Sequence, residues 1–168
     1  VKINYGNNFS RKHLGSIKQA YSKAPFFKEI FFELENIYKK EHVYLIDFNL
    51  DFIKLVSNKI NLKLDFISSY ELVKNNSLII DFKGNDLVLE LCKQVECKIY
   101  ISGTWCLDFI LPDTFIKEGI EFIFQEFEHP VYNQSNNKDS FISHLSSLDA
   151  LFNLGFKGFE NLVKNING

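Results

Sequence analysis

The sequence predicts an α/β fold, in which packed helices accompany a small parallel or mixed sheet. Apolar residues recur at three- and four-residue steps in several segments, as on one face of a helix. Two short alternating or β-branched segments, residues 98–102 and 120–127, are separated by a helical pattern, as parallel strands must be. The length of 168 residues suits one domain that spans the whole chain, residues 1–168.

The first sixty residues predict one strand and three helices. Residues 1–5 alternate between apolar and polar side chains, which indicates a short strand. Ser10 is expected to cap the first helix, and Pro25 suits the first position of the second. The third helix is expected over residues 43–60. The core side chains predicted from helical spacing here and in later helices are Phe27, Ile30, Phe31, Leu34, Phe48, Phe52, Leu55, Leu91 and Leu151.

The remaining residues alternate between short strands and helices. Asp86 is expected to cap a helix, Pro112 to end one, and Gly155 to end another. The predicted elements are strands at 62–67, 98–102 and 120–127, a short extended piece or helix approach at 77–82, helices at 86–95, 105–110, 115–118, 145–154 and 159–166, and a polar loop at 128–139.

Composition excludes several classes of protein. A net charge of −2 argues against nucleic-acid binding, which needs a concentrated positive patch. No apolar run approaches the ~20 residues that span a bilayer, and no signal peptide opens the chain, so we expect a cytoplasmic protein without membrane insertion. The chain begins with Val1 and contains no methionine, which predicts a fragment or a trimmed product.

Cofactor and metal motifs are missing from the sequence. The four histidines, His13, His42, His129 and His144, are dispersed without the spacing of metal ligands. Phosphate-loop, dinucleotide-binding and nucleophile-elbow motifs are also absent. Cys106 is expected to be inert rather than a nucleophile opposite His129. We therefore expect neither a metal site nor a cofactor.

The first candidate segment for a site is Tyr100-Ile101-Ser102-Gly103, which ends a predicted strand. In open α/β sheets, ligands bind beyond the carboxyl ends of the strands. Gly103 would permit close approach of a ligand to the backbone, and the following helix would offer N–H groups to an anion. Ser102 and Gly103 are therefore predicted to bind substrate, although an ordinary strand-to-helix turn explains the same residues.

The second candidate segment is His129-Pro130-Val131-Tyr132-Asn133-Gln134, just after a predicted strand. A proline holds the preceding residue extended, which fixes where the histidine ring points. Imidazole titrates near neutrality and suits a general acid or base. Tyr132 and Gln134 are two residues apart, on the same side of an extended segment. The alternative is a surface loop with a structural histidine.

The third candidate segment is the helix that begins near residue 145. Ser146, Asp149 and Asn153 stand at positions i, i+3 and i+7, which places them on one polar stripe. A capping box, with Ser146 as the cap and Asp149 reaching back, explains the aspartate but leaves Asn153 unexplained. A capped helix start is also a good place to hold a carboxylate beside a ligand, so both interpretations stay open.

Five blocks of the sequence together resemble the WbqC-like family of bacterial proteins. Their order and spacing over most of the chain are more specific than any single block. The blocks are Arg11-Lys12-His13-Leu14, Ala20-Tyr21-Ser22-Lys23-Ala24-Pro25-Phe26-Phe27, Tyr100–Gly103, His129–Gln134 and Leu145-Ser146-Ser147-Leu148-Asp149-Ala150-Leu151-Phe152-Asn153-Leu154-Gly155.

The resemblance carries expectations about origin and completeness. Members of the family sit among genes for O antigen and other surface polysaccharides. The family normally opens with a segment rich in Gln, Pro, Tyr and Gly, an acidic strand pair and an Arg-Asn motif, none of which precedes Val1. The resemblance therefore implies that the chain lacks the N-terminal segment of the family and forms an incomplete three-layer domain.

The leading hypothesis is an enzyme of surface-polysaccharide precursor biosynthesis, a transferase that acts on a sugar nucleotide or an amino sugar. His129 would be the general base, oriented or charge-stabilised by Asp149, and Tyr132, Gln134 and Asn153 would bind substrate. The expected partner is a small molecule, a sugar nucleotide, and the oligomeric state is left open. The alternative is a non-catalytic binding or scaffolding subunit of the polysaccharide machinery.

Overall fold

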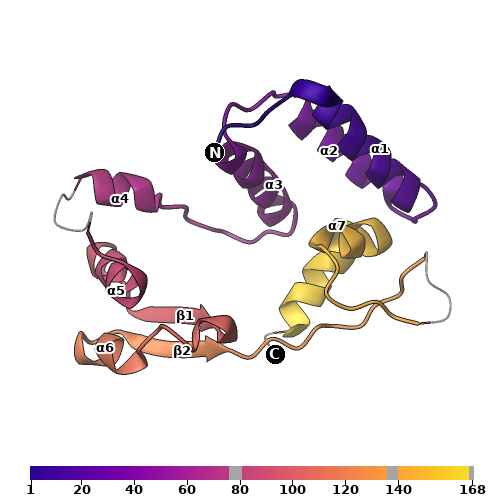
Figure 1. The fold of residues 1–168 in the computed structure, drawn as a ribbon. Helices are drawn as coiled ribbons and strands as arrows, with labels where there is room; N and C mark the ends of the chain where they lie inside the picture. Colours follow the sequence, from indigo (N-terminus) through magenta and orange to yellow (C-terminus); the bar gives the residue numbers. More distant parts are fainter. Residues whose placement is uncertain (76–80, 136–139, 167–168) are drawn as a thin grey trace. The chain divides into compact units, whose positions relative to one another are not determined.

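The computed structural model describes residues 1–75, 81–135 and 140–166 (Figure 1). The chain divides into two units, each described here by itself. The helical unit comprises residues 1–64 and 129–168, and the sheet unit comprises residues 65–128. Helices together with a two-stranded parallel sheet confirm the predicted α/β class.

The described part of the helical unit contains four α-helices. They are α1 (Phe9–Tyr21), α2 (Phe27–Tyr38), α3 (Leu45–Lys59) and α7 (Ser147–Ile166), preceded by the 3-10 helix η1 (Gly6–Asn8). The core lies between α2 and α7, where Ile30 and Leu34 pack with Leu151 and Phe152. The ring of Tyr21, at the end of α1, stacks on Phe152 with 4.6 Å between centroids. This packing fixes the start of α7 in the middle of the unit.

The core prediction is confirmed for six of the nine predicted side chains. Ile30, Leu34 and Leu151 are buried, and Phe27, Phe31 and Phe52 are partly buried against them. The other three, Phe48, Leu55 and Leu91, are partly buried outside the clusters found among the described residues.

Helix α7 bends sharply at Gly155, which separates the two helices that the sequence predicts there. Gly155 has φ +66° and ψ 178°, a combination that is nearly restricted to glycine. A Cβ atom at this position would lie 2.6 Å from Cδ1 of Phe26. The bend therefore needs glycine for its dihedral angles and for its close packing.

The sheet unit contains α4 (Ser69–Asn75), α5 (Gly84–Gln94), α6 (Pro112–Lys117) and two strands. Strand β1 (Ile99–Gly103) pairs in parallel with β2 (Glu121–Gln125), so that Ser102 lies opposite Phe124. Tyr100 stacks on buried Phe115 with 5.0 Å between ring centroids. Both strands agree with the sequence prediction to within two residues.

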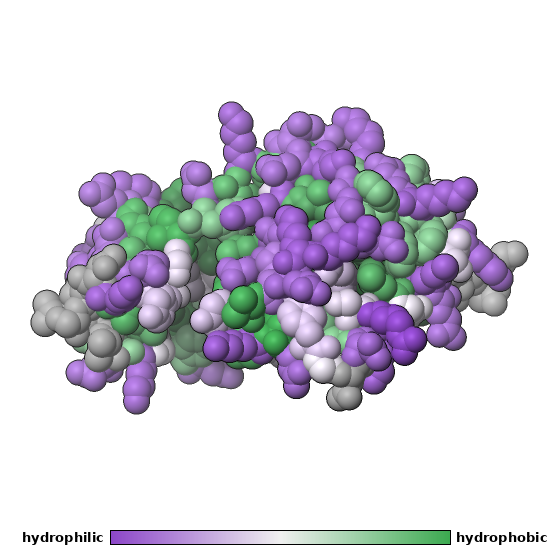
Figure 2. All heavy atoms as spheres, turned by 90° about the horizontal axis from the view of Figure 1, so that it is seen from above, coloured by the Kyte–Doolittle hydropathy of each residue, from purple (hydrophilic) through white to green (hydrophobic). Residues whose placement is uncertain are grey.

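On the face of the sheet opposite Tyr100, apolar side chains remain accessible to solvent. Ile99, Ile101 and Ile123 are 51%, 61% and 38% exposed. Hydrophobic side chains also reach the surface elsewhere, among charged ones (Figure 2). Of the helices described, none has the length and apolar character needed to cross a membrane.

Two predicted strands are wrong. Residues 1–5 make only an isolated antiparallel bridge, between Lys2 and Tyr44. Residues 62–67 have no regular structure, and every one of them is exposed. An alternating pattern produces a strand only where a partner strand and an apolar surface are available, and neither segment has both. The extended piece predicted at 77–82 lies largely outside the described residues.

Several predicted helix ends are also wrong. Helix α1 begins after Asn8 rather than at Ser10, and α5 begins at Gly84, so Asp86 lies inside its first turn. Pro25 occupies the turn before α2. Pro112 begins α6 instead of ending a helix, because its missing N–H costs nothing at a first helical position. Residues 104–106 form only a 3-10 turn, η3 (Thr104–Cys106).

Candidate functional site

The loop that follows residue 128 is bound to the first turn of α7 by a buried carboxylate. Oδ2 of Asp149 accepts a hydrogen bond from the Tyr132 hydroxyl at 2.8 Å and from Nε2 of Gln134 at 2.9 Å. Asp149 is 5% exposed and Gln134 is 6% exposed. The second and third candidate segments therefore meet in space.

The amide of Gln134 also joins the two sides of this loop. Its Nε2 donates to the carbonyl oxygen of Ile142 at 2.9 Å, and its Oε1 accepts from the backbone N–H of Ile142 at 2.9 Å. Together with the hydrogen bond to Asp149, the Gln134 side chain makes three hydrogen bonds, and each is to another group of the protein. The geometry supports a role for Gln134 in holding the loop against α7.

Asn153 provides a second attachment one turn further along α7. Its Oδ1 accepts hydrogen bonds from the backbone N–H of Ser135 at 2.8 Å and from its hydroxyl at 2.6 Å. Its Nδ2 donates to the carbonyl oxygen of Asp149 at 2.8 Å. These contacts account for Asn153, which a capping box leaves unexplained.

The helix start differs from the predicted capping box. Oγ of Ser146 accepts from the backbone N–H of Leu148 at 3.3 Å, as a cap does. The side chain of Asp149 does not complete the box, because its carboxylate binds Tyr132 and Gln134 instead. The aspartate is thus committed to the loop rather than to the helix end.

Neutral donors surround the buried Asp149 carboxylate. None of the ion pairs among the described residues includes Asp149. Burial raises the pKa of Tyr132 to about 12, and the hydrogen bond and charge of Asp149 add to the rise. Burial likewise raises the pKa of Tyr21 to about 12, again with a contribution from Asp149. Both hydroxyl groups therefore keep their protons at neutral pH.

His129 lies beside this cluster, with its ring near the ring of Tyr132. The rings of His129 and Tyr132 have centroids 6.3 Å apart, and the ring of Phe141 is 5.5 Å from His129. Nδ1 of His129 is 2.9 Å from the carbonyl oxygen of Pro130. Because a carbonyl oxygen only accepts, this contact is a hydrogen bond when the proton is on Nδ1.

Ser102 and Gly103 belong to the sheet unit. Ser102 is 3% exposed, and its hydroxyl lies 3.4 Å from the carbonyl oxygen of Gly103. Gly103 has ordinary extended dihedral angles, and a Cβ atom there would meet nothing within 4 Å. Nothing in the local backbone therefore requires glycine, and the substrate-binding role of both residues stays a prediction.

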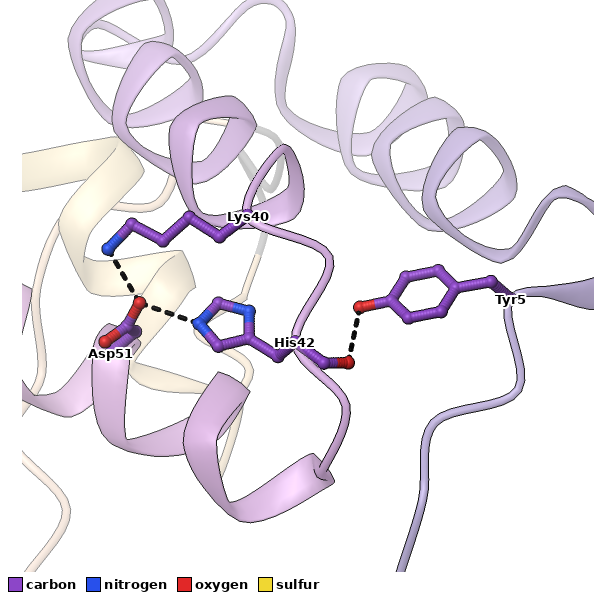
Figure 3. Close-up of polar contacts among 4 residues, drawn as sticks. All are labelled: Tyr5, Lys40, His42 and Asp51. Atoms are coloured by element: carbon purple, nitrogen blue, oxygen red, sulfur yellow. Dashed lines mark hydrogen bonds and ion pairs between the residues drawn. The ribbon is translucent and has the colours of Figure 1, made fainter.

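A second polar cluster joins the N-terminal segment to α3 (Figure 3). Oδ2 of Asp51 is 2.8 Å from Nε2 of His42 and 2.7 Å from Nζ of Lys40. These hydrogen bonds, first from Lys40 and then from His42, lower the pKa of Asp51. The hydroxyl of Tyr5 donates to the carbonyl oxygen of His42 at 3.0 Å. The side chain of His42 is only 11% exposed. The cluster is therefore best explained by a structural role, in which it attaches the neighbouring segment to α3.

Three residues near Asp149 and His129 are not among the site residues predicted from the sequence. Tyr21 borders Asp149 from α1, Ser135 binds Asn153, and the ring of His144 lies 5.3 Å from that of His129. Tyr21 falls within a block that carries the family resemblance, which is the one available signal. Within residues 1–75, 81–135 and 140–166, no three His, Cys, Asp or Glu side chains are grouped to hold a metal ion.

Comparison with known proteins identifies the family of the chain. No curated protein and no solved structure matches it. A sequence profile of the WbqC-like protein family matches residues 1–161, which include all the residues of the Asp149 cluster. The chain therefore belongs to the WbqC-like protein family.

Proposed function

We propose that the chain is an enzyme of bacterial surface-polysaccharide precursor biosynthesis, contributing to the O antigen of lipopolysaccharide. It transfers a group from an activated donor to a sugar nucleotide or to the amino group of an amino sugar. The sequence resemblance implies a surface-polysaccharide context, and family membership over residues 1–161 supports the proposal.

The observation that carries the proposal is that the ring of His129 lies beside that of Tyr132, whose hydroxyl donates to the buried Asp149. A hydroxyl or amine must lose a proton when it attacks a donor, and a histidine is the side chain most often used to accept it. The Pro130 carbonyl oxygen, 2.9 Å from Nδ1, orients the ring of His129. In the proposed reaction, Nε2 of His129 takes the proton of the attacking group while the new bond forms and the donor's leaving group departs.

Asp149 then has a positioning role, because it is too buried to meet a substrate directly. Its carboxylate holds the Tyr132 hydroxyl, whose oxygen retains lone pairs that can accept a hydrogen bond from the substrate. Gln134 and Asn153 hold the loop in place. Tyr132 is thus the proposed substrate-binding residue beside the base.

The test compares sugar nucleotides in cells whose only copy of the gene carries His129→Ala or Tyr132→Phe. An enzyme that has lost its base leaves its substrate unmodified, so mass spectrometry should detect an accumulated precursor. His13→Ala, which changes an exposed histidine on α1, is the matched control and should leave the nucleotide pool unchanged.

The alternative is a scaffolding subunit, and the same experiment separates the two. Loss of a scaffold reduces polysaccharide only when the protein unfolds or its interface changes. A normal nucleotide pool in cells with folded His129→Ala protein would therefore reject the enzymatic proposal.

A further inference from the structure

The three cysteines of the chain lie in one hydrophobic cluster of the sheet unit. Cys92, on α5, is buried in this cluster, and Cys97 and Cys106 are partly buried beside it. All three thiols contribute to the raised pKa of Tyr100, although burial is its main cause. The proposed reaction makes no use of these sulfur atoms.

The end of α5 brings Cys92 and Cys97 together. The backbone N–H of Cys97 donates to the carbonyl oxygen of Cys92 at 2.9 Å, and that of Glu96 donates to the carbonyl oxygen of Lys93 at 3.1 Å. Glu96 has a φ angle of +51°, in the left-handed region. These bonds and this angle form a Schellman motif, in which the side chains at the positions of Cys92 and Cys97 commonly touch.

The backbone at this helix end permits a disulfide between the two residues. Their hydrogen bond, with standard bond lengths, limits the separation of their Cα atoms to less than about 7 Å. Disulfides join Cα atoms that are roughly 4.4–6.8 Å apart. The two thiols are also within hydrogen-bonding reach of each other. A bond between them therefore needs little movement of the backbone.

The two thiols differ in their access to solvent. Cys92 is 8% exposed, and burial raises its pKa to about 11, with a smaller contribution from Cys97. Cys97 is partly exposed, and its thiol donates to the carbonyl oxygen of Ile99 at 3.1 Å, at the start of β1. Because the thiolate is the reactive form, Cys97 is the thiol that meets a dissolved oxidant first, and Cys92 is the one that closes the bond.

We propose that Cys92 and Cys97 are a reversible redox pair, which a small disulfide such as oxidised glutathione converts into an intramolecular disulfide. The new bond fixes the last turn of α5 and removes the thiol hydrogen that Ile99 accepts at the start of β1. Oxidation therefore acts on the connection between a helix and a strand of the sheet unit. This inference is independent of the proposed function.

The reaction proceeds by two thiol–disulfide exchanges. The thiolate of Cys97 attacks one sulfur of oxidised glutathione and releases one glutathione thiolate. The thiolate of Cys92 then attacks the Cys97 sulfur of the mixed disulfide and releases the second glutathione. The two protein thiols lose two protons and two electrons in all, and one oxidised glutathione becomes two reduced glutathione molecules.

The test incubates the purified, reduced chain with oxidised glutathione and follows it by thiol titration and mass spectrometry. We expect the loss of two of the three thiols and a mass lower by two hydrogen atoms. Trypsin cleaves after Lys93, so a linked pair of peptides should identify the bond between Cys92 and Cys97. Dithiothreitol should restore all three thiols.

Two serine variants complete the experiment. Cys106→Ser is the matched control, because it changes a cysteine of the same cluster and should form the same disulfide. Cys97→Ser keeps a hydroxyl that can donate to Ile99, so it should melt as the unaltered chain does and form no internal disulfide. Three thiols that stay reduced in the unaltered chain, a final product that carries glutathione instead of an internal bond, or a disulfide that includes Cys106 would each overturn the inference.

Discussion

The hydroxyl of Tyr132 donates a 2.8 Å hydrogen bond to Oδ2 of Asp149, and thereby connects the loop to the first turn of α7. Tyr132→Phe removes this bond while keeping the ring that packs at 5.2 Å from Phe141. We expect a loss of about 1–2 kcal/mol in the free energy of unfolding, since a hydrogen bond to a carboxylate is lost. Urea denaturation measures the effect. Tyr70→Phe, at a 69% exposed tyrosine, is the control, and equal stability of the two variants would contradict the assigned contact.

The charge of Asp149 should be detectable in the titration of its tyrosine neighbours. Tyr21 and Tyr132 have pKa values raised to about 12, chiefly by burial and then by Asp149. Because their folded-state pKa lies above the ordinary value of 10.0, their contribution to stability is complete below pH 10 and is lost as the pH rises towards 12. In Asp149→Asn, both pKa values should fall towards 10 but stay above it. Ultraviolet absorbance of tyrosinate measures this, and an unchanged titration curve would show that Asp149 does not act on these hydroxyl groups.

The attachment of the loop at Asn153 can be tested by comparing two alanine variants. Asn153→Ala removes three hydrogen bonds and leaves the N–H of Ser135 without its partner, so we expect a loss of about 2–3 kcal/mol. Ser135→Ala removes only the hydroxyl contact and should cost about 1 kcal/mol or less. Thermal unfolding ranks the two. If Ser135→Ala were less stable than Asn153→Ala, Asn153 would not be the residue that attaches the loop to α7.

Glycine is needed at the bend of α7, and a second glycine supplies the comparison. Gly155→Ala places a Cβ atom 2.6 Å from the Phe26 ring at φ +66°, so we expect a loss of about 2 kcal/mol or more. Gly15 lies within α1, where an added Cβ atom meets nothing within 4 Å. Gly15→Ala should therefore stabilise the protein by about 0.5–1 kcal/mol, because alanine is the better helix former. If both variants changed the melting temperature in the same direction, the specific requirement for glycine at the bend of α7 would be contradicted.

The sequence predicts the helical core well because burial repeats with the period of the helix. Ile30 and Leu34, one turn apart on α2, are an example of this local signal. Asp149 and Asn153 are likewise one turn apart on α7, so their shared face is predictable, whereas their partners Tyr132 and Ser135 depend on how a loop folds back. The pairing of His129 with His144 also spans that loop, and no spacing rule anticipates it.

The strand errors have a different origin. Residues 62–67 have a strand-like pattern, but a strand is stabilised by partners that the pattern does not contain. The same holds for residues 1–5, where only Lys2 finds a bridge partner. Strands β1 and β2 are predicted correctly because each has the other as its neighbour.

In the proposed reaction, His129 acts as the general base beside the Asp149 cluster. The most direct test is the amount of surface polysaccharide made by cells that carry His129→Asn, with protein level and melting temperature measured in parallel. A missing general base should slow the reaction by about 10²–10⁴-fold, so we expect cells with folded His129→Asn protein at its normal level to lose surface polysaccharide, while His13→Asn cells remain normal. Normal polysaccharide in cells with folded, normally abundant His129→Asn protein would show that His129 is not the base.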